Sequence, residues 1–393
     1  MINGQLSLET PGAFVPEPQV RRELPSGVAP EAIPPTARVA FSKQTLLKEL
    51  APFAQKSTRK GLLLCLHELV VYGILIALVL FVPSLTVKVL ASIVAGFKLT
   101  AFYTLGHDAG HGSLVEDKQL NWWLAQALAI LSWQNHKLWV LDHHLLHHPK
   151  TNGEQYDFYR PCSKAEYDAL SPAAKWFERF VRSPNLIGFG VNFICRWWVT
   201  TRLAPTSQTP RQHVAAAYVH LASVLVYQAA FIGFLMWAPT FAPITQAQAL
   251  WLGFALPLAI FALVTGASLY LMHTHERLPW FKGGISRKGD FAPELCAMHM
   301  TLPRPLHKFI HNVFAHSAHH AHPGIPPYNL LDAQLHFDKL LGERALVEPM
   351  TVRGALRTLR VCKLYDFDKH QWLDFNGTPT TAPINLANRG ALL

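Results

Sequence analysis

The chain has 393 residues, of which 50% are hydrophobic and 15% are charged, and its formal net charge is +10. A typical soluble protein carries about 25% charged residues, so this composition excludes a mainly disordered chain, a collagen and a coiled coil, and favours an integral membrane protein. The positive charge forms no basic stripe with interleaved aromatic residues, so no nucleic-acid partner is predicted. The 5 cysteines form no CxxC pair. Any metal would therefore have to be bound by some of the 21 histidines.

The first 45 residues are rich in proline and glycine and lack an apolar period, so they are predicted to form a flexible N-terminal arm. Four later segments are apolar over about 20 residues each, which is the length that a helix needs to cross the hydrocarbon core. The predicted spans are about 61–82, 85–105, 214–238 and 250–271. Short turns at Pro83 and Pro239 would join them into two hairpins.

Charged residues both weaken and support these assignments. Glu68, Lys88 and Lys98 fall inside the first two spans, where a charge is costly unless it snorkels or faces protein. Between Gln212 and His275 there is no Asp, Glu, Lys or Arg, and a soluble domain would rarely bury so long a segment without a surface charge. The second hairpin is therefore the stronger membrane prediction.

Lysine and arginine are concentrated in the arm, in residues 106–211 and in the C-terminal third. The positive-inside rule places these regions in the cytoplasm. We therefore predict an all-α integral membrane protein in which four transmembrane helices carry a cytoplasmic helical cap. The membrane domain would span 46–345 and be followed by a C-terminal cytoplasmic tail, 346–393. With no signal peptide at the start, a bacterial inner membrane is the favoured location.

Two tryptophan-rich stretches, 121–133 and 186–199, are short for membrane spans. Because indole rings prefer the membrane interface, we predict that both lie on the cytoplasmic leaflet. The alternative is that both are buried core helices.

Three histidine clusters, which we call the first, second and third boxes, lie on the predicted cytoplasmic side. Their spacings of i, i+3 and i+4 place the imidazoles of each box on one face of a helix. Zinc takes four ligands, so eight neutral imidazoles are more typical of two metals that keep open positions for oxygen. Imidazole binds zinc, copper, iron and nickel alike, so the ligands alone leave the metal open. The boxes consist of His107 and His111, of His144, His147 and His148, and of His316, His319 and His320.

A ninth ligand is predicted where the fourth span ends. The sequence Leu271-Met-His-Thr-His275 would be delivered by that helix to the same surface as the boxes. His273 is the preferred ligand and His275 is the alternative. A role beside the metal rather than on it remains open for both.

From about residue 60 to 340, the chain resembles the integral-membrane fatty acid desaturase superfamily, and within it the acyl-lipid delta-12 (omega-6) branch. The order of hairpin, first box, second box, hairpin and third box is similar. So are the segments His107–Ser113, Trp139–Pro161, His273–Trp280 and Ile325–Leu330. The chain departs from the branch at Ala109, where cysteine is common, and in an additional histidine, His143, directly before His144.

The resemblance implies a di-iron centre that uses O2 as co-substrate to introduce a cis double bond into a fatty acyl lipid. It implies an external electron donor, ferredoxin-like or cytochrome b5-like, and no catalytic side chain beyond the metal centre. Asp157, Asp108 and Asn312 become candidates to orient a ligand imidazole. The implied iron ligands are His107, His111, His144, His147, His148, His316, His319 and His320, with His273 as the ninth.

Two other functions stay open from the sequence. The same scaffold could hydroxylate, ketolate, acetylenate or decarboxylate its substrate, because the outcome depends on how the C–H bond is held. A metal transporter would need polar residues along its spans, and the last hairpin offers little beyond His220 and Gln228. The basic cytoplasmic face would suit an acidic electron carrier.

Overall fold

The computed structural model describes residues 43–153, 157, 159–282 and 293–386. The predicted N-terminal arm lies outside these residues except at 43–45. The described part is mostly helical, as predicted. Its α-helices are α1 (Lys43–Leu50), α2 (Thr58–Phe81), α3 (Leu85–Gly110), α4 (Lys118–Leu131), α5 (His136–Asp142), α6 (Lys164–Ala169), α7 (Pro172–Val181), α8 (Ile187–Asn192), α9 (Arg211–Trp237), α10 (Gln246–Leu250), α11 (Leu256–His273), α12 (Arg304–Phe309), α13 (His316–Ala321), α14 (Pro327–Leu341) and α15 (Val352–Val361).

Two small sheets and several irregular helical segments complete the described fold. The prediction of an all-α protein is corrected by the sheets, whose strands are β1 (His299–Thr301), β2 (Val347–Pro349), β3 (Leu364–Asp366) and β4 (Gln371–Leu373). The segments His143–His147, Phe193–Arg202 and Trp251–Ala255 are π-helical. Short 3-10 turns lie at Ala51–Ala54, Ala238–Thr240, Pro293–Cys296 and Gly342–Arg344.

Four helices in the described residues are long and apolar enough to cross a membrane: Thr58–Phe81, Leu85–Gly110, Arg211–Thr240 and Gln246–His273. Each begins earlier or ends later than the predicted span, because the helix continues beyond the apolar run. The Ser57 and Ser84 side chains accept hydrogen bonds from the first turns of α2 and α3. At its other end α3 runs on to Gly110, so the first box lies on its last turn and not in a loop after it.

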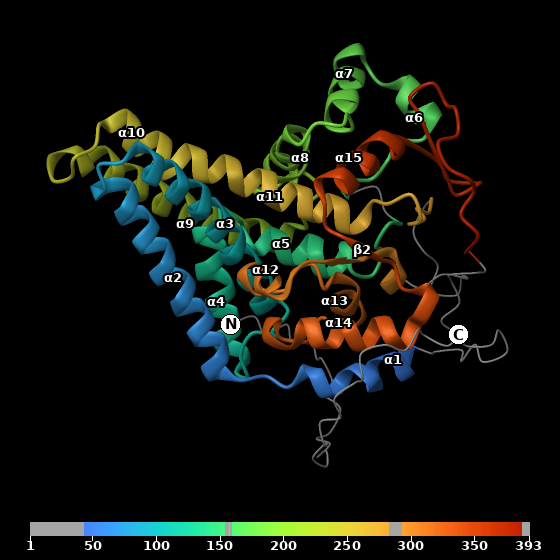
Figure 1. Ribbon diagram of the computed structural model, residues 1–393, viewed down its shortest axis with the longest axis horizontal. Helices are drawn as coiled ribbons and strands as arrows, with labels where there is room; N and C mark the ends of the chain where they lie inside the picture. The colour runs from blue at the N-terminus through green and yellow to red at the C-terminus, as the bar shows by residue number, and fades with distance from the viewer. Residues whose placement is uncertain (1–42, 154–156, 158, 283–292, 387–393) are drawn as a thin grey trace. The chain divides into compact units, whose positions relative to one another are not determined.

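Helix α3 is the centre of the helical packing and contacts α2, α4 and α11. It runs beside α11 (Figure 1). Glycine permits this close approach, since a Cβ on Gly96 would lie 2.5 Å from Cβ of Ile260. On the other side of α11, a Cβ on Gly266 would lie 2.4 Å from the carbonyl oxygen of Phe189 in α8. This packing fixes the C-terminal ends of α3 and α11, which carry His107 and His273.

The charges inside the first two spans face protein. Lys98 and Glu68 are 2% and 1% exposed, and Nζ of Lys98 lies 3.0 Å from Oε2 of Glu68. His311, from the loop before the third box, places Nε2 3.2 Å from Oε1 of the same carboxylate. Lys88 donates to the carbonyl oxygens of Leu80 and Pro243. Each charge therefore has a partner that offsets its burial.

Replacing Glu68 with leucine should lower the free energy of unfolding by about 3–5 kcal/mol, because Lys98 would remain buried without its carboxylate. Adding Lys98→Met to that variant should recover most of the loss, since an apolar pair has no charge to desolvate. Thermal unfolding of the protein in detergent measures both changes. If Glu68→Leu alone unfolds at the same temperature as the wild type, the pair of Glu68 and Lys98 does not contribute to stability.

The segment before the third box and the C-terminal region are tied together by β-structure. Strand β1 pairs in parallel with β2, with His299 opposite Val347, and β3 pairs antiparallel with β4. Residues beyond 346 were predicted only as a tail, yet they form β2, α15, β3 and β4. Nε1 of Trp372 donates to the carbonyl oxygen of His275, just after α11. The C-terminal region thus packs against the end of the helix that carries His273.

The two tryptophan-rich stretches differ in exposure. On α4, Trp122 and Trp123 are 44% and 58% exposed, as expected for a helix at an interface. In the second stretch Trp197 is buried, and Trp198 donates its indole hydrogen to the carbonyl oxygen of Trp133. The second stretch therefore follows the alternative of a packed core helix.

Candidate metal centre

The first box is presented by the last turn of α3. His107 and His111 lie one turn apart, and their ring centroids are 4.8 Å from each other. Nδ1 of His107 lies 2.8 Å from Oδ1 of Asp108, a contact that orients the imidazole. A Cβ on Gly110 would lie 2.4 Å from the ring of Trp139, so only glycine allows α5 this close to the box.

The second box lies on a π-helical turn that follows α5. The backbone N–H of His148 donates to the carbonyl oxygen of His143, five residues earlier, instead of to a carbonyl four residues earlier. This wider turn brings Nε2 of His143 to 3.0 Å from Nε2 of His148. Single π turns of this kind are frequent at functional sites. His143, rather than His144, thereby faces the other boxes.

The third box is the short helix α13, which is held from two sides. The Ser317 hydroxyl donates to the carbonyl oxygen of Ala297, and the backbone N–H of Ala318 donates to Gln334 of α14. All three box histidines are buried. His273, the last residue of α11, meets them with Nε2 at 2.8 Å from Nε2 of His316.

Nine imidazoles from these elements form two adjacent groups whose ligand atoms lie within 4.8 Å of one another. The groups touch where the rings of His148 and His320 stack with centroids 4.5 Å apart. Both the second and the third box contribute to each group, so the two groups are one connected site. The first group is His107, His111, His143, His148 and His319, and the second group is His147, His273, His316 and His320.

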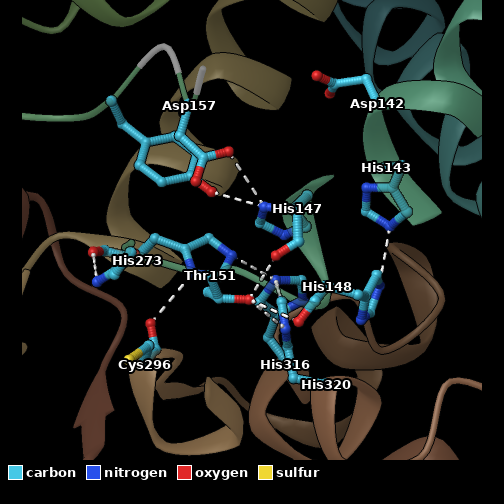
Figure 2. Close-up of polar contacts among 12 residues, drawn as sticks. Asp142, His143, His147, His148, Thr151, Asp157, His273, Cys296, His316 and His320 are labelled. Atoms are coloured by element: carbon cyan, nitrogen blue, oxygen red, sulfur yellow. Dashed lines mark hydrogen bonds and ion pairs between the residues drawn. The ribbon is translucent and has the colours of Figure 1, made fainter. Parts of the chain in front are cut away.

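The hydrogen bonds of the second group fix which nitrogen carries the proton. Nδ1 of His273 donates to the carbonyl oxygen of Cys296, and Nδ1 of His147 faces Oδ1 of Asp157 at 3.2 Å, as Figure 2 shows. The Thr151 hydroxyl donates to the carbonyl oxygen of His147 and so accepts from Nδ1 of His320. These three imidazoles therefore carry their protons on Nδ1.

Lone pairs consequently converge in the second group. Nε2 of His316 lies 2.8 Å from Nε2 of His273 and 3.1 Å from Nε2 of His320. One Nε2–H can satisfy only one of these neighbours, so the arrangement is suited to a cation between the nitrogens. Second contacts on Nδ1 are also the usual way in which proteins orient metal-ligating histidines. The donor set fits metal ions.

Burial also keeps these imidazoles neutral. Desolvation, together with the surrounding imidazoles, holds the pKa well below the usual 6.5 for six members of the two groups: His111, His143, His148, His316, His319 and His320. A metal ligand must be deprotonated, so the site is ready to bind metal at neutral pH without releasing protons from these rings.

Three predicted site residues lie elsewhere. His144 belongs to neither group, although its ring is 4.4 Å from that of His111 and its Nε2 is buried without a hydrogen-bond partner among the described residues. His275 accepts from the backbone N–H of Arg277 and approaches Glu348. Asn312, at φ 59°, donates to the carbonyl oxygen of Pro327 and shapes the turn before α13.

Sequence reasoning missed three residues that hold the second group. The hydroxyl oxygen of Tyr159 lies 3.0 Å from Nδ1 of His147, and its ring stacks on His273 with centroids 5.0 Å apart. Thr151 and the carbonyl oxygen of Cys296 contact His320 and His273. Tyr159 and Thr151 lie in the segment that carried the family resemblance. The resemblance of that segment could have drawn attention to both residues, but it did not indicate which imidazoles they contact.

A small cavity of about 20 Å³ with a largely apolar lining borders both groups. Its lining includes four imidazoles of the two groups: His107, His143, His316 and His319. The rest is mainly apolar or aromatic and includes Tyr103, Leu269, Met272, Val313 and Leu330. This lining offers few hydrogen-bond partners, so the surroundings of the imidazoles suit an uncharged, apolar ligand better than a charged one.

Known proteins are similar to this chain in sequence. The family model for fatty acid desaturases matches residues 83–348. An sn-1 acyl-lipid omega-3 desaturase (ferredoxin) from Synechocystis is 24% identical over 270 residues, which are 64% of this chain and 67% of the relative. A fatty acid desaturase from Bacillus subtilis is 26% identical over 347 residues, which are 86% of this chain and 92% of that protein.

A chloroplastic omega-6 fatty acid desaturase from Glycine max is 21% identical over 287 residues, or 71% of this chain and 63% of the relative. The resemblance inferred from the boxes is therefore confirmed at the level of the family. Because the family model covers most of the chain, including all three boxes, the chain belongs to the fatty acid desaturase family and is an oxidoreductase of lipid metabolism.

Proposed function

We propose that the chain is an O2-dependent membrane desaturase that introduces a cis double bond into a fatty acyl chain at a di-iron centre. The observation that carries this proposal is the pair of adjacent imidazole groups, five and four in number, beside an apolar cavity. The proposed iron ligands are the nine members of these groups. They include His143 instead of His144, which the spacing of the second box predicts as a ligand.

When bound, the two irons would supply the activation of O2 that removal of two hydrogens from adjacent methylenes requires. The chain's own residues orient the ligand imidazoles and position the substrate. Asp108 and Asp157 hold His107 and His147 through Nδ1, so that each Nε2 faces the centre. The apolar side chains beside the imidazoles would exclude water and align the acyl chain, which is the positioning that selects one C–H bond.

The electron donor and the orientation in the membrane belong to the same proposal. Two relatives carry ferredoxin in their names, and these are acyl-lipid omega-3 desaturases from Synechocystis and Nostoc. We propose an external ferredoxin-like or cytochrome b5-like carrier that docks on the cytoplasmic side of an inner membrane. The net charge of +10 supports attraction of an acidic carrier. The rate of reduction by such a carrier should therefore fall as ionic strength rises.

Product analysis tests the proposed reaction. The chain is expressed in a host that makes only saturated and monounsaturated acyl chains, together with a ferredoxin and its reductase. Total lipids are then analysed by gas chromatography–mass spectrometry, with the empty vector as control. The expected result is a new unsaturated acyl chain, and the position of its double bond follows from the fragmentation of a derivative.

Other products would move the chain to a different reaction on the same site. A hydroxy acid, a ketone, an alkyne or a terminal alkene in place of the new double bond would contradict desaturation while leaving the metal site intact. Unchanged lipids in cells whose purified protein contains two irons and is reduced by the supplied ferredoxin would contradict an acyl substrate.

A further inference from the structure

Arg182 caps the C-terminal end of α7, far in sequence from every box, and its side chain is 0% exposed. Its charge is balanced by Glu178, which accepts from Nε of Arg182 and also pairs with Arg196. A buried guanidinium is costly unless its N–H groups find acceptors. The acceptors that Arg182 finds lead to the second imidazole group.

One edge of the guanidinium fixes the backbone around Tyr159. Nη2 donates to the carbonyl oxygens of Tyr159, at 2.9 Å, and Arg160, at 2.6 Å. Tyr159 in turn places its hydroxyl 3.0 Å from Nδ1 of His147 and stacks its ring nearly parallel to that of His273, at an interplanar angle of 6°. The position of this one tyrosine thus affects two imidazoles of the second group.

The other edge reaches the helix that carries His273. Nη1 donates to the hydroxyl of Tyr270 at 3.0 Å, and Tyr270 is buried on α11, three residues before His273. Arg182 therefore joins the two structures that position His147 and His273: the Tyr159 segment and the end of α11. The hydrogen bonds to both structures come from one rigid, planar guanidinium group.

We propose that Arg182 is a positioning residue for the second metal site, because its guanidinium holds the Tyr159 segment and α11 in register. This inference rests on the proposed metal centre. A lysine cannot replace the arginine here, since an ammonium has no planar fork to donate to two neighbouring carbonyl oxygens and to a hydroxyl on the other side. The contacts described for Arg182 do not reach the first imidazole group.

Anaerobic titration of the apoprotein in detergent with Fe²⁺ tests the inference. His111→Ala disrupts the first group and leaves the second, whereas His316→Ala does the reverse, so each background reports mainly on one site. Adding Arg182→Lys should weaken Fe²⁺ binding about 10- to 100-fold in the His111→Ala background, the range seen when contacts behind a metal ligand are lost. In the His316→Ala background the same change should leave binding within about twofold.

Arg196→Lys is the matched control, because the Arg196 side chain pairs with the same Glu178 carboxylate but otherwise lies over the ring of Phe177. It should leave both sites unchanged. Mössbauer spectra of the ⁵⁷Fe-loaded full-length protein give a second readout. In Arg182→Lys, the signal that is lost in His316→Ala should broaden or shrink, and the other signal should stay.

Equal weakening of both sites by Arg182→Lys, or the same loss in Arg196→Lys, would overturn the inference in favour of general destabilisation. Wild-type Fe²⁺ binding at the second site in Arg182→Lys would overturn it as well. If Arg182→Lys does not fold, Tyr270→Phe removes the hydrogen bond between Arg182 and α11. Weaker Fe²⁺ binding at the second site alone is then expected. A wild-type protein that binds no Fe²⁺ contradicts the proposed function itself, whereas two-site binding that ignores Arg182 contradicts only this inference.

Discussion

Alanine in place of His316 should abolish the new double bond and lower the iron content of the purified protein. His316 is the member of the second group whose Nε2 lies closest to those of both His273 and His320. Without it, the remaining second-group imidazoles cannot hold a second ion well. Loss of a contact behind a ligand already costs 10- to 100-fold, so loss of the ligand itself should lower product formation by at least about a hundredfold.

His336→Ala provides the matched control. His336 lies on α14, outside both groups, and its Nε2 is 3.3 Å from Glu49. This variant removes an imidazole of the same size without touching the site, and it should retain the wild-type product and iron content. Both variants are compared by gas chromatography–mass spectrometry of lipids and by iron per chain at equal protein levels. An active His316→Ala protein would rule out the proposed ligand set.

The second box should respond asymmetrically to alanine substitution. His143→Ala should lose about one of the two irons and most of the activity, because the π turn directs His143 into the first group. His144→Ala should keep both irons and change activity by less than about tenfold, since His144 belongs to neither group and packs beside His111 and Trp139. The two substitutions are adjacent and chemically identical, so each serves as the control for the other.

The reverse result would have a specific structural meaning. Loss of iron in His144→Ala, with retention in His143→Ala, would show that the second box is a regular α-helical turn in the metal-loaded protein. In that geometry His144, His147 and His148 would share one face, as the i, i+3, i+4 spacing predicts. Iron per chain separates the two geometries even where activity is low in both variants.

The features that could be predicted from the sequence are those that local patterns determine. Apolar runs located the four candidate spans, and the spacing within each box located seven of the nine histidines in the two groups. Asp157 and Asp108 were also expected near ligand imidazoles, and both contact one. Sequence spacing succeeds in these cases because the partners lie on one helix or directly beside it.

The remaining features depend on geometry that spacing does not contain. The choice between His143 and His144 depends on one π turn, whereas the prediction assumed 3.6 residues per turn. Arg182 reaches Tyr159 and Tyr270 only after α7, α11 and the segment around Tyr159 have packed together. The β1–β2 pair joins residues from both sides of α13 and α14, and so it could not be read from either strand alone.

The distribution of imidazoles over α3, the π turn, α11 and α13 has a consequence for biosynthesis. Chains are made from the N-terminus, and early regions fold first. A ribosome-bound chain that ends before α13 carries His107, His111, His143, His147, His148 and His273, but neither group is complete. If the proposed function is correct, a chain that can react with oxygen would exist only after the last candidate span has been inserted and α13 has docked. Truncated chains, which would otherwise be a source of uncontrolled oxidants inside a lipid bilayer, should therefore be inert.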